Sequence, residues 1–152
     1  MDKLWAPWRS KFIRKKIKRG CIFCIKNNKA RNKFVIKKSK FSFALLNIYP
    51  YNNGHIMVSP YRHVKSLKGL NDNELLDMMK LVKEMEKLLE KKLKPQGFNI
   101  GINTGAVGGA GYKGHVHIHI VPRWNGDTNF MPVTANTKVM PQSLEELFNI
   151  LK

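Results

Sequence analysis

The stretch His115-Val116-His117-Ile118-His119-Ile120-Val121 places three histidines at alternate positions in the C-terminal third of the chain. Side chains along a strand alternate between the two faces of the sheet. The three histidines therefore share one face, and the aliphatic residues between them share the face that can pack on a core. We predict a strand over residues 115–121 that Pro122 closes, with one polar, reactive face and one buried face.

Three imidazoles on one face of a strand suit two kinds of chemistry, metal ligation and phosphate chemistry. The unperturbed pKa of histidine lies near 6.5, so most of the imidazoles are neutral at pH 7. A neutral imidazole can attack phosphorus and form a covalent intermediate, and a second one can donate a proton to the leaving group. Residues 104–114, directly before the histidines, contain five glycines, whose backbone N–H groups can bind phosphate oxygens.

The rest of the chain predicts an α+β fold. Asn71 and Glu74 have the spacing of a capping box, and an apolar stripe at helical spacing predicts a helix over residues 72–94. Ser143 opens a second, short helix in the same way. Short strands are expected at residues 34–36, 41–47, 55–59 (stopped by Pro60) and 98–103, with a hairpin between the first two. This order indicates an antiparallel sheet with helices on one side, within a single domain spanning residues 1–152.

The positive charge is large and uneven. The chain carries a net charge of +18, and residues 1–40 hold 15 Lys or Arg against one acid, Asp2. This basic lead-in, with residues 1–20 as an N-terminal arm, would attract polyanions such as nucleotides or nucleic acids. A general enrichment in lysine explains the charge equally well. Neither a membrane-spanning run nor a signal segment is found, so we expect a cytoplasmic protein with no membrane partner.

Cys21 and Cys24 form a Cys-x-x-Cys pair, which supplies half of a tetrahedral zinc site. The chain has no other cysteine, so two histidines would have to complete the site. The alternative is two reduced thiols without a metal. A catalytic redox pair is disfavoured, because no predicted strand precedes Cys21 to suggest a thioredoxin-like unit.

The motif and its surroundings resemble the histidine triad (HIT) family, whose signature alternates three histidines with apolar residues. The resemblance covers roughly residues 4–150 and is closest to the bacterial and archaeal branch related to diadenosine tetraphosphate phosphorylases. It rests on residues 115–121 together with five other stretches: Leu4-Trp5-Ala6-Pro7-Trp8-Arg9, Phe43-Ala44-Leu45-Leu46-Asn47, Gly54-His55-Ile56-Met57-Val58-Ser59-Pro60, Phe98-Asn99-Ile100-Gly101-Ile102-Asn103, and the segment from Val121 to Phe130. It implies a five-stranded antiparallel sheet with one long and one or two short helices, and a homodimer.

The resemblance also implies a role for individual residues. His117 would be the nucleophile that forms a nucleotidyl-enzyme, with His119 contacting the phosphate and assisting the leaving group and His55 hydrogen-bonded around the triad. Substrate contacts would come from Asn47 at the ribose, Asn103 at the α-phosphate, and Gly109 and Gly111 in the glycine-rich loop. In zinc-bearing relatives, the positions of His63 and His115 complete the site begun by Cys21 and Cys24.

The expected activity is hydrolysis or phosphorolysis of dinucleoside polyphosphates such as diadenosine tetraphosphate. A nucleoside phosphoramidase using the same histidines is an alternative, although the glutamine that many relatives carry before the triad is missing from residues 108–114. A rival of another class is a zinc-stabilised nucleic-acid-binding protein, whose basic arm would bind RNA or DNA and whose triad would be vestigial or act on adenylated ends.

Overall fold

The computed structural model describes residues 21–24, 33–130, 134 and 138–152. The basic arm of residues 1–20 therefore lies outside the described residues. Five antiparallel strands form one sheet in the order β1-β2-β3-β5-β4. The strands are β1 Val35–Lys38, β2 Ser42–Leu46, β3 Ile56–Pro60, β4 Gly97–Ile102 and β5 Ile118–Arg123, and the helices are η2 Leu67–Gly69, α3 Asp72–Leu93 and α5 Leu144–Leu151.

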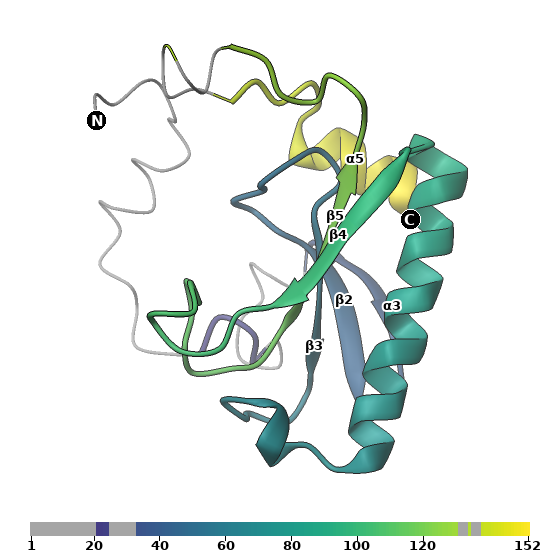
Figure 1. Cartoon of the computed structure of the whole chain (residues 1–152). Helices are drawn as coiled ribbons and strands as arrows, with labels where there is room; N and C mark the ends of the chain where they lie inside the picture. The colour runs from purple at the N-terminus through teal and green to yellow at the C-terminus, as the bar shows by residue number, and fades with distance from the viewer. Residues whose placement is uncertain (1–20, 25–32, 131–133, 135–137) are drawn as a thin grey trace.

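Helices α3 and α5 begin where the sequence predicts. The side chain of Asn71 accepts a hydrogen bond from the Glu74 N–H, and Ser143 caps α5 with the same reciprocal pattern. Helix α3 ends before Lys94, which takes a left-handed conformation with a φ of 49°. Figure 1 shows α3 running along one face of the sheet, with α5 beside its C-terminal end.

The face of the sheet toward α3 and α5 carries the main core. Its buried residues come from the alternate positions of the central strands and from one stripe of α3; they are Ala44, Leu46, Ile56, Val58, Ile118, Ile120, Met78, Leu81, Val82, Met85, Leu89, Leu147 and Leu151. The opposite face has a smaller buried cluster and carries the histidines. The expected α+β fold with an antiparallel sheet and helices on one side is confirmed.

Pro60 ends its strand as predicted, whereas the prediction that Pro122 closes the histidine strand was wrong, because β5 runs on to Arg123. Pro60 lies at the end of β3 and pairs with Ser42, and Pro122 lies within β5 and pairs with Phe98. The ladder between β3 and β5 covers only three pairs, from Val58↔Ile118 to Ile56↔Ile120. Pro60 and Pro122 lie beyond the two ends of this ladder. The nitrogen of each proline faces the side on which its strand has no partner there, so the lack of an N–H costs no ladder hydrogen bond.

Strand β5 also starts later than the histidine pattern predicts. It begins at Ile118, so His115 and His117 precede it. The backbone of Val116 leaves the ladder because its N–H donates to the Val64 carbonyl at 2.7 Å and its carbonyl accepts from Ser59 Oγ at 3.0 Å. Hydropathy alternation cannot reveal this departure, because the extended backbone keeps the same alternation outside the ladder.

Candidate active site and metal cluster

His55 and His119 form a hydrogen-bonded pair on the face of the sheet away from α3. His119 comes from β5, opposite Met57, and His55 directly precedes β3. The Nε2 of His55 lies 2.9 Å from the Nδ1 of His119. The chain enters His55 from Gly54, whose φ of +72° is one that other residues rarely adopt and where a Cβ would come within 2.6 Å of Leu93.

The hydrogen bonds around this pair determine where the protons lie. His55 Nδ1 accepts the backbone N–H of Tyr51 at 3.0 Å and lies 3.3 Å from the amide nitrogen of Asn47. A neutral imidazole carries one N–H, so the proton of His55 must be on Nε2, where it donates to His119 Nδ1. His119 then carries its own proton on Nε2. This nitrogen becomes a donor that can meet a bound substrate.

His117 lies beside this pair with the opposite arrangement. Its Nδ1 is 2.9 Å from the carbonyl oxygen of His115, so Nδ1 carries the proton and donates it. The Nε2 of His117 is therefore left with a lone pair. The rings of His117 and His119 lie edge to face, with 4.7 Å between their centroids. A lone pair and an N–H donor on neighbouring rings are the two groups that a displacement at phosphorus needs.

Burial keeps these imidazoles neutral. Desolvation lowers the pKa of His119 from 6.5 to about 4 and that of His55 to about 3, with a smaller contribution from the neighbouring histidines. Burial also lowers the pKa of His117, while its hydrogen bond to the His115 carbonyl works in the other direction. The lone pair on His117 is consequently available at pH 7.

The predicted substrate contacts have partners of their own in this structure. Asn47 is buried, and its Oδ1 accepts the Tyr49 N–H in addition to the contact of its amide with His55. Asn103 donates to the Gly109 carbonyl at 3.3 Å and so ties the glycine-rich loop to the end of β4. The Gly109 N–H donates to Ala106 within the loop and is not turned toward a phosphate, whereas Gly111 is exposed nearby.

The four predicted metal ligands lie close together at the N-terminal end of the histidine run. Cys21, Cys24, His63 and His115 place one ligand atom each within 4.8 Å of one another. The Nδ1 of His115 lies 3.2 Å from the sulfur of Cys21 and 4.0 Å from that of Cys24, and the Nδ1 of His63 lies 3.5 Å from the sulfur of Cys24. Tetrahedral zinc with sulfur and nitrogen ligands requires separations of roughly 3.3–3.8 Å between its ligand atoms. The cluster therefore has the donor chemistry of a tetrahedral site, and the three quoted separations lie close to its dimensions.

The second nitrogen of His115 supports the same interpretation. Its Nε2 lies 2.9 Å from the Pro60 carbonyl, to which it donates, so Nδ1 keeps its lone pair facing the two sulfurs. Metal-binding histidines commonly hold their second N–H in this way. His115 is thus oriented as a ligand, and unlike His117 it does not present a lone pair to the open face.

Two aromatic residues that the sequence reasoning missed complete the surroundings. Phe23, between the cysteines, stacks on His117 with 4.5 Å between ring centroids and an interplanar angle of 25°. Tyr51 stacks on His119 at 5.4 Å and 28° and is 52% exposed. The only sequence signals for these contacts are the position of Phe23 inside the Cys-x-x-Cys pair and that of Tyr51 four residues before His55. Neither position is enough to predict a contact with a histidine.

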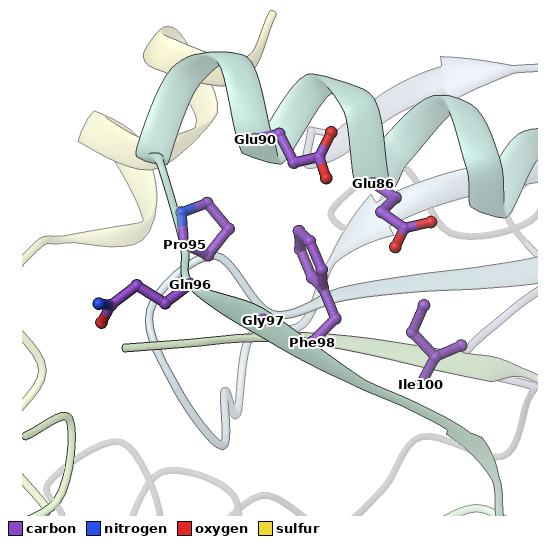
Figure 2. Close-up of a pocket in the computed structure, with 7 residues that line it drawn as sticks. All are labelled: Glu86, Glu90, Pro95, Gln96, Gly97, Phe98 and Ile100. Atoms are coloured by element: carbon purple, nitrogen blue, oxygen red, sulfur yellow. The ribbon is translucent and has the colours of Figure 1, made fainter. Parts of the chain in front are cut away.

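A shallow pocket of about 540 Å³ lies on the other side of β4, toward α3. Figure 2 shows it between the C-terminal half of α3 and β4, which is an edge strand of the sheet. It is lined by Glu86, Glu90, Pro95, Gln96, Gly97, Phe98 and Ile100. Its two carboxylates, from Glu86 and Glu90, would repel an anionic ligand.

Comparison with known proteins agrees with this geometry. Over 117 residues the chain is 40% identical to the AP-4-A phosphorylase of Mycobacterium tuberculosis, covering 77% of this chain and 60% of that protein. Over 93 residues it is 38% identical to the asymmetrical bis(5'-nucleosyl)-tetraphosphatase of Schizosaccharomyces pombe, covering 61% of this chain and 50% of that protein. The chain thus spans between half and two thirds of these two relatives.

A solved structure shares the fold over nearly its full length. The zinc-bound histidine triad family protein from Mycobacterium smegmatis superposes with a TM-score of 0.70 and 25% identity, covering 87% of this chain and 90% of that one. Residues 28–126, which contain His55, His63 and the whole triad, match the HIT domain. The chain therefore belongs to the HIT family.

Proposed function

We propose that this protein is a nucleotidyl hydrolase or transferase that cleaves dinucleoside polyphosphates such as diadenosine tetraphosphate. The Nε2 lone pair of His117 attacks the α-phosphorus, a P–N bond forms, and the P–O bond to the polyphosphate breaks with its electron pair leaving on oxygen. Water or inorganic phosphate then attacks the same phosphorus, and the electron pair of the P–N bond returns to Nε2. Hydrolysis and phosphorolysis differ only in this second nucleophile.

One observation carries the proposal: the hydrogen bonds set the tautomers of His117 and His119 in opposite senses on adjacent rings. His117 donates a hydrogen bond from Nδ1 to the His115 carbonyl, so its Nε2 keeps a lone pair. His119 accepts a hydrogen bond from His55 at Nδ1, so its Nε2 carries the N–H. The first is the nucleophile, and the second can hydrogen-bond a phosphate oxygen as charge develops on it. This division of roles resembles the way in which a carboxylate fixes the tautomer of a catalytic histidine.

The low pKa of His119 favours a polyphosphate leaving group over an amine. An amine leaving from a phosphoramidate must take up a proton, whereas a nucleoside polyphosphate leaves as a stable anion. His119, with a pKa of about 4 in the substrate-free protein, is a hydrogen-bond donor rather than a strong acid at pH 7. The names of the two enzyme relatives point to the same substrate class.

The test is incubation with diadenosine tetraphosphate, with and without inorganic phosphate, followed by chromatography of the products. AMP plus ATP in the absence of phosphate identifies a hydrolase, and ADP plus ATP only in its presence identifies a phosphorylase. Mass spectrometry of the acid-sensitive adduct should locate one adenylyl group on His117. Folded protein that neither turns over the dinucleotide nor forms the adduct would overturn the proposal.

His117→Asn is the informative variant, because asparagine can still donate to the His115 carbonyl but cannot attack phosphorus. We expect it to bind the dinucleotide in calorimetry with nearly unchanged affinity and to lose adduct formation and turnover. Thermal unfolding of the variant provides the control for an intact fold.

We further propose that Cys21, Cys24, His63 and His115 hold a structural zinc ion. The donor set, the short separations and the orientation of His115 support this, and the relative from Mycobacterium smegmatis is zinc-bound. Zinc held by four protein ligands supplies folding free energy and no open position for substrate. Within the site, His115 would thereby be fixed as a support for His117.

We also propose that the protein is a homodimer paired along β4. This strand is an edge of the sheet, and Ile100 on it is 42% exposed beside the pocket in Figure 2. An open edge next to an exposed apolar residue invites pairing with a second copy. In light scattering, Ile100→Asp should give a monomer, while Leu67→Asp, at a residue of similar exposure on η2, should not. Equal masses for both variants would exclude β4 as the interface.

No helix in the described residues is both long and apolar enough to span a membrane. A cytoplasmic location stays part of the proposal and can be checked by fractionating cells that produce the full chain.

A further inference from the structure

Phe23 is buried between the metal cluster and the triad. It is 1% exposed, and its ring lies against three others: stacked on His117, tilted on His115 at 5.6 Å, and edge to face with Tyr112 at 5.9 Å. Its backbone N–H donates to the sulfur of Cys21 at 3.4 Å. The residue is therefore tied at its backbone to the candidate metal ligands and at its ring to the proposed nucleophile.

The imidazole of His117 needs such a contact to point in one direction. Its hydrogen bond to the His115 carbonyl fixes the position of Nδ1 but leaves the ring free to tilt about that contact. The near-parallel ring of Phe23 restricts the tilt on one face, and the edge-to-face ring of His119 lies on another side. A displacement at phosphorus requires the attacking lone pair to be aligned with the bond that breaks, and small misplacements of a reacting group lower rates steeply.

Two of the three contacts that restrain His117 come from the cluster of Cys21, Cys24, His63 and His115 or from the residue between its cysteines. The carbonyl that accepts the hydrogen bond of His117 belongs to His115. The ring that stacks on His117 belongs to Phe23, between Cys21 and Cys24. These two contacts link the cluster to the reacting ring.

Phe23 has surroundings that differ from those of a base-stacking ring and from those of an ordinary core residue. A platform for a nucleobase would need an open ring face, which a side chain with 1% exposure does not offer. A simple core filler would behave like its neighbour Phe43, which belongs to the same buried cluster and is 0% exposed. Phe43 stacks on Tyr61 and has no histidine partner among the described ring contacts, so it is a matched control.

We propose that Phe23 is a positioning residue for the nucleophile: its ring, held by the Cys21–Cys24 segment, sets the angle at which His117 presents Nε2 to the α-phosphorus. The inference rests on the proposed function, because it assigns the geometric control of the same displacement. It assigns to the metal cluster an effect on the rate of adenylyl transfer in addition to any effect on folding.

The test compares Phe23→Leu with Phe43→Leu in the full chain. Both changes leave an apolar side chain in the same core, but only the first removes a ring from His117. In single-turnover experiments with diadenosine tetraphosphate, Phe23→Leu should slow formation of the His117 adduct roughly tenfold to a hundredfold, with KM changed little. Phe43→Leu should leave this rate within about twofold of wild type while losing a similar amount of stability.

A spectroscopic measurement checks the contact without relying on activity. The stacked ring of Phe23 should move the ring-proton resonances of His117 upfield, and these can be assigned from the His117→Asn spectrum. Phe23→Leu should move them downfield and Phe43→Leu should not. If Phe23→Leu fails to fold, Phe23→Met, which keeps more of the side-chain volume, serves in its place.

The outcomes separate the two proposals. A wild-type protein that forms no adduct refutes the proposed function, whereas the resonance shift still reports whether Phe23 orients His117. Equal slowing by Phe23→Leu and Phe43→Leu, or an unchanged His117 resonance in Phe23→Leu, would overturn the positioning role and leave Phe23 as a core residue.

Discussion

The Nε2 of His55 donates a hydrogen bond to the Nδ1 of His119 across 2.9 Å, and the direction of this bond is fixed by Tyr51. Because the Tyr51 N–H already occupies Nδ1 of His55, the proton cannot lie on the other nitrogen of that ring. The backbone at Tyr51 therefore determines, through two imidazoles, which nitrogen of His119 carries a proton. A backbone amide has no titration near pH 7, so this arrangement is insensitive to moderate changes in pH.

Removing the donor at His55 should impair catalysis more than binding. In His55→Leu, nothing holds the His119 tautomer, and a fraction of the molecules would present a lone pair instead of an N–H to the leaving group. We expect kcat for dinucleotide cleavage to fall about a hundredfold, with a small change in KM. Steady-state kinetics on the purified variant provides the measurement.

His55→Gln is the matched control, since its amide can still donate to His119. It should retain several times more activity than His55→Leu at similar stability. If both variants lose the same activity, the hydrogen bond from His55 does not set the His119 tautomer.

Burial of neutral histidines should make the fold sensitive to acid. His119 has a pKa of about 4 in the folded protein and 6.5 as its ordinary value, so the unfolded chain binds more protons between these values. Stability is then fully present above pH 6.5 and falls as the pH drops toward 4. The depression corresponds to at most about 3 kcal/mol for this one residue.

Denaturant unfolding of wild type and His119→Gln at pH 7, 6 and 5 measures this dependence. Glutamine does not titrate, so the loss of unfolding free energy between pH 7 and 5 should be smaller in the variant. Parallel curves for the two proteins would show that His119 is not held neutral by the fold. His55, with a pKa of about 3, contributes in the same direction in both proteins.

The sequence predicts the secondary structure well where local signals are strong. The capping boxes at Asn71 and Ser143 place the starts of α3 and α5, and the alternation around His117 and His119 correctly puts the histidines on the face opposite the aliphatic core. Strand ends were less predictable. Pro60 ends β3 as predicted, but β5 runs through Pro122 to Arg123, because its pairing with β4 continues there. That pairing is a property of the sheet and not of the local sequence.

The proton positions in the site could not be predicted at all. They depend on the Tyr51 N–H and on the carbonyls of His115 and Pro60, and every residue has such backbone groups. The stacking of Phe23 on His117 joins residues 94 positions apart and follows only from the path of the Cys21–Cys24 segment. Residue types suggest which chemistry is feasible, and tertiary contacts decide which nitrogen performs it.

Asp77 on α3 should contribute to stability without affecting the reaction. Its carboxylate accepts from Ser39 Oγ and Ser42 Oγ, at 2.6 Å each, and from the Phe41 N–H at 3.1 Å. Burial by itself would raise the pKa of Asp77, but these hydrogen bonds lower it overall. The carboxylate therefore fastens the turn between β1 and β2 to the helix.

In Asp77→Asn, an amide N–H must face one of these donors, so we expect a loss of about 1–3 kcal/mol in the free energy of unfolding. Asp72→Asn, which removes an exposed carboxylate from the same helix, should cost no more than about 1 kcal/mol. Neither change should alter kcat. Urea unfolding combined with the cleavage assay decides the matter, and equal stability losses would contradict the role of the Asp77 hydrogen bonds.

We expect about one zinc ion per chain. Zinc binding should require His63, which is exposed and lies far from the cysteines in the sequence. The Nδ1 of His63 lies 3.5 Å from the sulfur of Cys24. Replacing it with glutamine removes one of four ligands and should release most of the metal. His55→Gln is the matched control, because it changes a buried histidine outside the cluster and should keep its zinc.

Elemental analysis of the purified full chain gives the stoichiometry, and thermal unfolding with and without a chelator gives its energetic consequence. A ligand that binds only the folded state at a hundred times its Kd adds about 2.7 kcal/mol. The chelator should therefore lower the Tm of wild type and His55→Gln by several degrees and leave that of His63→Gln nearly unchanged. If His63→Gln and His55→Gln retain equal zinc, His63 is not a ligand. A chelator that has no effect on wild type would argue that the two thiols and two imidazoles form a hydrogen-bonded cluster without a metal.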